Sequence, residues 1–129
     1  MASLLLVQAR MRALLLASFL VAGCSDSALE EDRAYRRVID RFDTYDQCIN
    51  DKTVQSCYQT FVLCSNRRVM VDLENRPLDG TYDLDGDIAV AMVEGDMIKF
   101  DLVRLSSAQM PGRNVWELAT PSFTGCDVE

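Results

Sequence analysis

The 129-residue chain contains no histidine. This absence excludes Ser-His and Cys-His nucleophile pairs, and it removes the commonest protein ligand of zinc. The carboxylates lie mainly in predicted turns and on polar faces, and none is embedded in an apolar run that would raise its pKa. We therefore expect a protein that is not an enzyme and that uses no cofactor.

The chain also lacks an apolar run long enough to cross a bilayer. Spanning needs about 20 apolar residues, and the apolar segment from Ala13 to Ala22 stops well short of this length. Arg10 and Arg12 precede the segment and give it the positive flank of an export signal. Translation from Met11 instead of Met1 gives a shorter leader of ordinary shape and the same exported product.

A short motif, Leu20-Val21-Ala22-Gly23-Cys24, closes the apolar segment. It resembles the lipobox of bacterial lipoproteins, and the resemblance covers residues 1–25 only. It implies that residues 1–23 are a signal peptide, that Cys24 is acylated with palmitate-like chains, and that residues 24–27 form a tether. Two or more chains suffice for stable membrane anchoring. Because Ser25 rather than aspartate follows the cysteine, similarity to enterobacterial sorting favours the periplasmic face of the outer membrane, with the inner membrane as the alternative.

Removal of the leader leaves 106 residues, with residues 28–129 forming a single small domain. The leader carries two arginines and no acid, so the net charge falls from −7 to −9. Nucleic acids and anionic lipid surfaces are therefore poor partners, whereas a basic protein is attracted.

Four cysteines remain besides Cys24, namely Cys48, Cys57, Cys64 and Cys126. An even number in a small exported domain indicates disulfides, and the absence of a CxxC spacing argues against a metal site. Cys57 and Cys64 fall on one predicted helix about 10 Å apart, beyond disulfide reach. We favour Cys48–Cys57 with Cys64–Cys126, and Cys48–Cys64 with Cys57–Cys126 is the alternative.

The first part of the domain has helical periodicity. Ser27 and Glu30 are spaced as a capping box. Apolar residues then recur every three or four positions, which predicts a helix over residues 28–48. A second periodic stretch predicts a helix over residues 53–64, so that the two form an αα-hairpin.

After Asn66 the periodicity changes to two, which is typical of strands. The pattern predicts a loop over residues 75–80, a hairpin turn at Glu94-Gly95 and a loop over residues 106–112. The predicted strands cover residues 69–73, 81–85, 87–93, 97–105 and 114–119. The expected fold class is α+β: an N-terminal αα-hairpin followed by an antiparallel β-meander of four or five strands, stapled by disulfides.

Acidic residues concentrate in the turns of this meander. The segment Asp83-Leu84-Asp85-Gly86-Asp87 fits an EF-hand loop in neither register, so we assign no metal to it. Because alternate turns of a meander share an edge, we expect part of the acidic set to gather at one end of the sheet. Such a rim suits a basic protein. The candidate partner-binding residues, with Asp79 beside them, are Asp83, Asp85, Asp87, Glu94 and Asp96.

Size, charge and location together suggest a function class. The chain is similar in general form to periplasmic inhibitor and immunity lipoproteins, which neutralise cell-wall hydrolases or secreted toxins. The leading hypothesis is therefore a non-enzymatic binder that inhibits a basic envelope-acting enzyme. The alternative is a structural or accessory lipoprotein of an envelope assembly, and a small-molecule or calcium-binding module ranks third.

Overall fold

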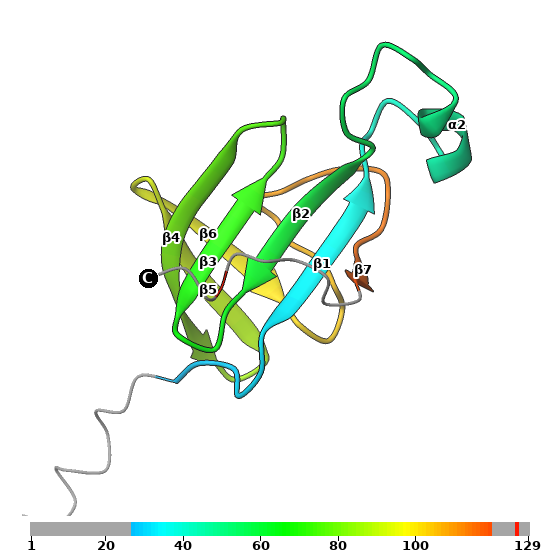
Figure 1. Ribbon diagram of the computed structural model, residues 1–129. Helices are drawn as coiled ribbons and strands as arrows, with labels where there is room; N and C mark the ends of the chain where they lie inside the picture. Colours follow the sequence, from blue (N-terminus) through cyan, green and yellow to red (C-terminus); the bar gives the residue numbers. More distant parts are fainter. Residues whose placement is uncertain (1–26, 120–125, 127–129) are drawn as a thin grey trace, which may run out of the picture.

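The fold is a single seven-stranded antiparallel sheet in the order β6-β5-β4-β3-β2-β1-β7 (Figure 1). The computed structural model describes residues 27–119 and Cys126. The predicted signal peptide and Cys24 lie outside these residues. Within them the only helix is α2, Tyr45–Ile49. The strands are β1 Arg33–Val38, β2 Tyr58–Leu63, β3 Arg68–Asp72, β4 Pro77–Asp85, β5 Ile88–Val93, β6 Asp96–Asp101 and β7 Glu117–Ala119.

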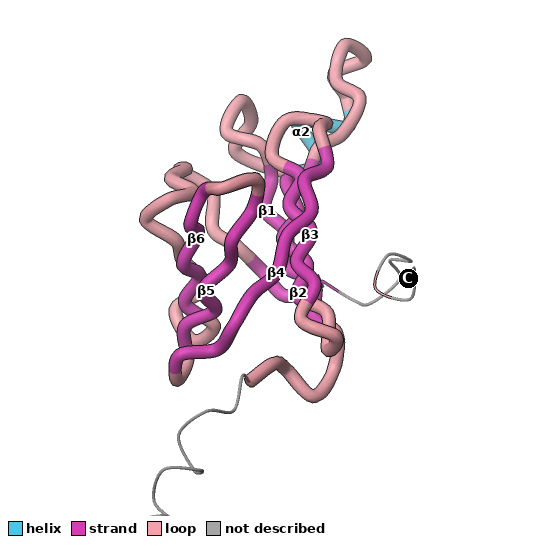
Figure 2. The backbone as a smooth tube through the Cα atoms, turned by 90° about the vertical axis from the view of Figure 1, so that its left-hand side faces the viewer, coloured by secondary structure: helices cyan, strands magenta, loops and turns pink. Residues whose placement is uncertain are grey.

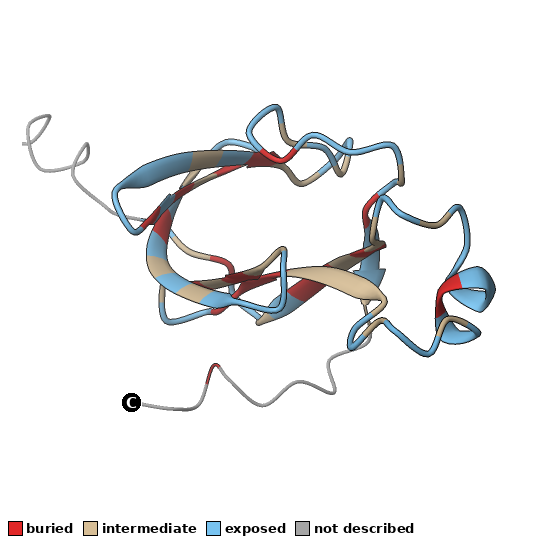
Figure 3. Cartoon of the chain, turned by 90° about the horizontal axis from the view of Figure 1, so that it is seen from above, coloured by how far each residue is buried: buried red, intermediate tan, exposed pale blue. Residues whose placement is uncertain are grey.

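The sheet curls into a half-barrel around one core (Figures 2 and 3). Strands β1 to β6 pair consecutively, and β7 returns to pair with β1. Curling brings Phe100 of β6 against Tyr35 of β1 and Phe61 of β2, with ring centroids 4.9 and 5.0 Å apart. Trp116 meets Phe100 edge-on from the segment before β7. Aromatic packing of this kind joins strands that are not neighbours in the sheet.

The predicted α+β class and its N-terminal αα-hairpin are wrong. Residues 28–48 contain β1 and only part of the short helix α2. The helical prediction rests on the spacing of apolar residues alone, whereas Arg37 is 4% exposed and shares the inner face with Tyr35. Once Arg37 is counted as interior, the alternation of a strand replaces the helical stripe.

The second predicted helix, residues 53–64, is also wrong, because β2 occupies its last six residues. Tyr58, Thr60, Phe61 and Val62 are aromatic or β-branched, and such residues favour a strand over a helix. Local propensity therefore outweighs the apolar spacing that suggested a helix. The buried neighbours β1 and β3 then supply the backbone hydrogen bonds on both sides of β2.

The capping box predicted at Ser27 and Glu30 is also absent, because Ser27 lies against β4. Leu84 donates its backbone N–H to the Ser27 carbonyl at 3.0 Å. Leu29 donates its N–H to the Tyr82 hydroxyl at 3.0 Å, and that hydroxyl donates to the Cys64 carbonyl at 2.6 Å. The entering chain is thus fixed to the inner side of the sheet.

The period-two part of the sequence folds as an antiparallel meander, with shifted boundaries. β4 begins at Pro77 inside the predicted loop, β6 ends at Asp101 before Leu105, and β7 covers only the end of residues 114–119. The predicted Glu94-Gly95 turn is present, with φ of 48° and 86° that suit a tight hairpin. Gly80 has no room for a side chain, because a Cβ there would lie 2.0 Å from the Met92 carbonyl oxygen.

Candidate functional site

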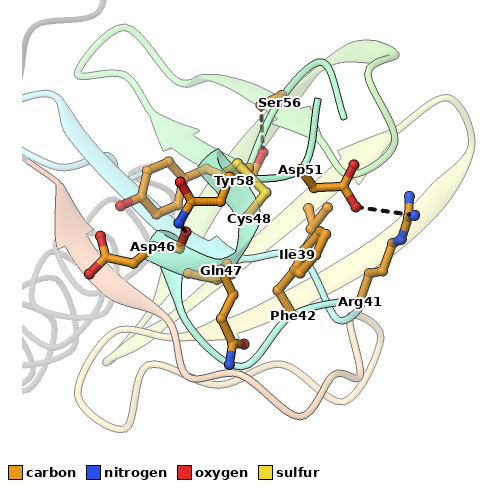
Figure 4. The surroundings of a disulfide bond; sticks show 12 residues. Ile39, Arg41, Phe42, Asp46, Gln47, Cys48, Asp51, Ser56 and Tyr58 are labelled. Atoms are coloured by element: carbon orange, nitrogen blue, oxygen red, sulfur yellow. Dashed lines mark hydrogen bonds and ion pairs between the residues drawn. A yellow bond between two sulfur atoms is a disulfide. The ribbon is translucent and has the colours of Figure 1, made fainter. Parts of the chain in front are cut away.

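Two disulfides are present, as expected, and they join the cysteines that the sequence favoured. Cys48–Cys57 closes the projection that carries α2, at the end of the sheet away from Ser27 (Figures 1 and 4). Tyr58 stacks on Tyr45 beside this bond, and an Arg41–Asp51 ion pair spans the same projection. Asp51 accepts hydrogen bonds from the Thr53 side chain and backbone, which lower its pKa. These contacts explain how the small projection is stabilised, and we assign them a structural role.

The second disulfide, Cys64–Cys126, fastens the C-terminal part of the chain over β1 and β2. Cys126 packs there with Ala34 and Val62 on the outer face of the sheet. Asp32 lies within 4.8 Å of both sulfur atoms, a grouping that resembles a metal site. Disulfide sulfurs are not thiolate ligands, and Asp32 already accepts the Ser65 backbone N–H at 2.7 Å. This grouping is therefore structural.

The acidic candidates do not form one rim, because the structure divides them between two ends of β5. Asp85 and Asp87 lie at the β4–β5 turn and Asp83 lies within β4 opposite Val90, whereas Glu94 and Asp96 lie at the β5–β6 turn. At about 3.3 Å per residue, the six residues of β5 separate the two turns by roughly 20 Å.

Arginines pair with several of these acids and reduce the local negative charge. Arg67 pairs with Asp83 at 2.5 Å, and Arg76 pairs with Glu94 at 3.6 Å. Asp79 lies 3.9 Å from Arg68. Exposed ion pairs of this kind are weak in free energy but they lower the field that a distant partner meets.

Exposed apolar side chains fill the space between the two acidic groups. Met92 of β5 and Met97 of β6 are cross-strand partners, 44% and 51% exposed. Ile88 and Val90 continue the row along the outer side of β5 and are only half-buried. We call these four residues, Ile88, Val90, Met92 and Met97, the open face. A contiguous exposed apolar row bounded by charges is typical of an interaction surface.

A pocket of about 360 Å³ lies elsewhere, along the segment that connects β6 to β7. Its lining contains three arginines and no acid: Arg37, Arg104 and Arg113. We call it the arginine pocket. Val103 and Val115, which are 70% and 83% exposed, also line it. In a chain with 20 acidic and 13 basic residues, this group of arginines has the opposite sign to the net charge of the chain.

Arg37 is the buried member of the arginine pocket. Its Nε donates to Gln59 Oε1 at 2.6 Å, and its Nη1 and Nη2 donate to the carbonyls of Met110 and Pro111 at 2.9 and 3.1 Å. The guanidinium also lies 4.6 Å from the centre of the Trp116 ring. Burial lowers the pKa of Arg37, and the nearby charge of Asp40 opposes this effect.

Two polar atoms on residues that line the arginine pocket have no partner among the described residues. They are the indole Nε1 of Trp116 and the hydroxyl Oγ of Ser107, and both are buried. Buried polar groups are nearly always hydrogen-bonded in folded proteins. The sequence pattern gives little sign of this site, because Arg37 falls in a predicted helix and Trp116 in a short predicted strand. The signal available was an arginine two positions after an aromatic residue in a strand-like alternation.

No protein family, curated protein or solved structure matches this chain. Of the residues that the structure describes, none belongs to a helix long and apolar enough to cross a membrane. The case for function therefore depends on the leader motif and on the surfaces described above.

Proposed function

We propose that this chain is an exported lipoprotein, acylated at Cys24, that binds a basic protein of the cell envelope through the open face. The single observation that carries the binding proposal is the exposed Met92–Met97 pair between two groups of acids. Methionine side chains adapt to a partner surface, and flanking charges raise the association rate and the selectivity. Inhibition of a basic cell-wall hydrolase or secreted toxin is the role that best fits such a binder.

The apolar centre supplies affinity in this proposal and the acids supply steering. Binding surfaces commonly have an apolar centre and a polar rim. The division of the acids into two groups suits this arrangement, because Asp85 and Asp87 bound the open face at one end and Glu94 and Asp96 bound it at the other. The lipid holds the chain in the compartment where a basic envelope enzyme acts.

The binding test compares variants in capture from envelope extracts of the source organism. Met97→Lys places a positive charge on the open face, and Ile49→Lys is the matched control, since Ile49 is also 51% exposed but lies on α2. We expect the wild-type chain and the control to retain one stoichiometric basic protein and the Met97 variant to lose it. The activity of the captured enzyme should fall when the wild-type chain is added. Equal capture by all three chains contradicts the open face as the binding site.

A charge test separates steering from contact. Reversal of both charges, Asp85→Lys with Asp87→Lys, should weaken capture in low salt and have little effect in high salt, because salt screens exposed charges. Unchanged capture in low salt contradicts the acidic contribution. Recovery of large envelope complexes alone, with no stoichiometric enzyme, favours an accessory role in an envelope assembly over inhibition.

The membrane address has its own test. Mass spectrometry of the wild-type chain should find residues 1–23 removed and lipid on Cys24, and Cys24→Ser should abolish both. If the Cys24→Ser chain still fractionates with membranes at its full unprocessed mass, and the wild-type peptide carries no lipid, the lipoprotein assignment is wrong. This result does not depend on the capture experiments.

A further inference from the structure

The arginine pocket has the groups needed to hold an anion. Three arginines line it, and none of the lining residues is acidic. Asp43 pairs with Arg113, and Asp40 and Asp101 lie near Arg37 and Arg104, respectively. Within the described part of the chain, however, no ion pair joins Arg37 or Arg104 to a carboxylate. The described residues therefore balance the positive charge of the pocket only in part.

The unpartnered donors give an independent reason to expect a ligand. Trp116 is 4% exposed, and its Nε1 has no acceptor among the described residues. The hydroxyl of Ser107, on the same pocket, is also without a partner there. Because a buried donor without an acceptor destabilises a fold, two of them on residues that line one pocket indicate an acceptor beyond the described residues.

The shape of the lining resists collapse of the pocket. Arg37 holds the carbonyls of Met110 and Pro111, and Gly112 leaves space for the guanidinium, since a Cβ there would lie 2.6 Å from Arg37 Nη1. On the other side, Asn114 donates to the carbonyls of Val38, Ile39 and Phe42. Both walls are thus fixed by buried or half-buried hydrogen bonds, so the site is preformed.

We infer that the arginine pocket binds a carboxylate of a polypeptide, an aspartate or glutamate side chain that stands next to an aliphatic residue. Arginine matches the geometry of a carboxylate, because its guanidinium donates two parallel hydrogen bonds to the two carboxylate oxygens. The exposed Val103 and Val115 fit an aliphatic neighbour of the acidic residue. A phosphate dianion fits less well, because the exported chain carries a net charge of −9 by the count above and repels a second negative charge.

This site goes beyond the proposed function, because it shares no residue with the open face and selects the opposite charge. A single envelope protein can present both a basic surface and an acidic segment, and a second protein can supply the latter. The inference therefore stands whether or not Cys24 is acylated or the open face binds.

The test uses the tryptophan fluorescence of the chain from Ser25 onwards, which contains every described residue, since Trp116 is the only tryptophan. The probes are the dipeptides N-acetyl-Val-Asp-amide and N-acetyl-Val-Asn-amide, with inorganic phosphate as a third probe. We expect a saturable change with the aspartate probe, at least about tenfold weaker binding of the asparagine probe, and weak binding of phosphate.

Variants locate the response. Arg104→Gln should weaken the aspartate probe about tenfold, whereas the control Arg41→Gln, an exposed arginine outside the pocket, should leave it unchanged. Arg104 is exposed, so its loss does not threaten folding, and circular dichroism checks this point. The inference is overturned by no saturable response, by equal binding of the two dipeptides, by tighter binding of phosphate, or by equal effects of the two variants.

Discussion

The outer face of the sheet is covered on one half and uncovered on the other. Over β1 and β2, Ala34 and Val62 pack under Cys126, which the disulfide to Cys64 holds in place. Over β5 and β6, Met92 and Met97 lie in register with about half of each side chain exposed. The chain thus carries apolar residues on both halves, and among the described residues Cys126 covers only one set.

This difference shows what the open half is suited for. In an antiparallel sheet with one face in solvent, every second residue of a strand points to that face and is usually polar. The covered half departs from that pattern because the chain itself supplies the second layer. The open half also departs from that pattern, but no second layer among the described residues covers its apolar side chains. Binding of another molecule would remove these side chains from water.

The largest expected effect breaks the covered half. Cys64→Ala with Cys126→Ala opens a loop of 62 residues and should lower the free energy of unfolding by about 4 kcal/mol on the chain-entropy estimate. Cys48→Ala with Cys57→Ala opens a separation of only nine residues and should cost about 3 kcal/mol. Urea denaturation of both double variants measures the difference. A larger loss for the Cys48–Cys57 pair would show that the Cys64–Cys126 bond contributes little to the covered half.

An intermediate effect is expected at Tyr82, which connects the entering chain to the sheet. Tyr82→Phe leaves the Leu29 N–H and the Cys64 carbonyl without their hydroxyl partner, at a cost of about 1–3 kcal/mol. Burial raises the pKa of Tyr82 above its ordinary value. The folded state therefore holds the phenolic proton more tightly than the unfolded chain does.

This pKa shift gives the Tyr82 prediction a pH dependence. The stabilisation is fully present below about pH 10, the ordinary pKa of tyrosine, and is lost as the pH rises through the higher pKa of the folded state. Urea midpoints measured from pH 8 to pH 11 should fall more steeply for the wild-type chain than for Tyr82→Phe. Parallel curves would show that the hydroxyl has no such role.

The smallest expected effect tests the comparison between the two halves directly. Met92→Thr on the open half should change the free energy of unfolding by less than about 0.5 kcal/mol, because the side chain is already half in water. Val62→Thr on the covered half buries a hydroxyl and should cost about 1–2 kcal/mol. Thermal denaturation of the two single variants suffices. Equal losses would mean that the two halves are covered alike.

The sequence predicted the second part of the fold better than the first for a physical reason. From β3 to β6 the strands are joined by short turns, and signals such as Glu94-Gly95 are local, so periodicity and turn chemistry agree. In β1 the decisive residue is Arg37, whose burial depends on Met110 and Pro111, more than 70 residues along the chain. A local pattern carries no information on such partners.

The candidate sites follow the same rule. The disulfide pairing could be predicted from the sequence, because two cysteines must lie close together to form a bond and this requirement excludes some pairings. The helical geometry from which we estimated the distance was nevertheless wrong. The division of the acidic residues between two ends of the sheet could be predicted only in part, since the number and order of strands decide which turns lie at the same end. The arginine pocket as a whole could not be predicted, because Arg37, Arg104 and Trp116 come together only after the sheet has curled; the alternation of Tyr35 and Arg37 indicated at most that Arg37 is interior.

The hydrogen bonds between Ser27 and Leu84 also set an orientation. Two residues, Ser25 and Asp26, lie between Cys24 and Ser27, which gives a reach of about 10 Å at full extension. If Cys24 is acylated as proposed, the β4–β5 hairpin stands just above the lipid headgroups, and the end of the body that carries α2 points outward (Figure 1). Asp85 and Asp87 then sit where anionic headgroups repel them, which holds the body upright on its anchor, and Glu94 and Asp96 are the acids that an approaching protein reaches first.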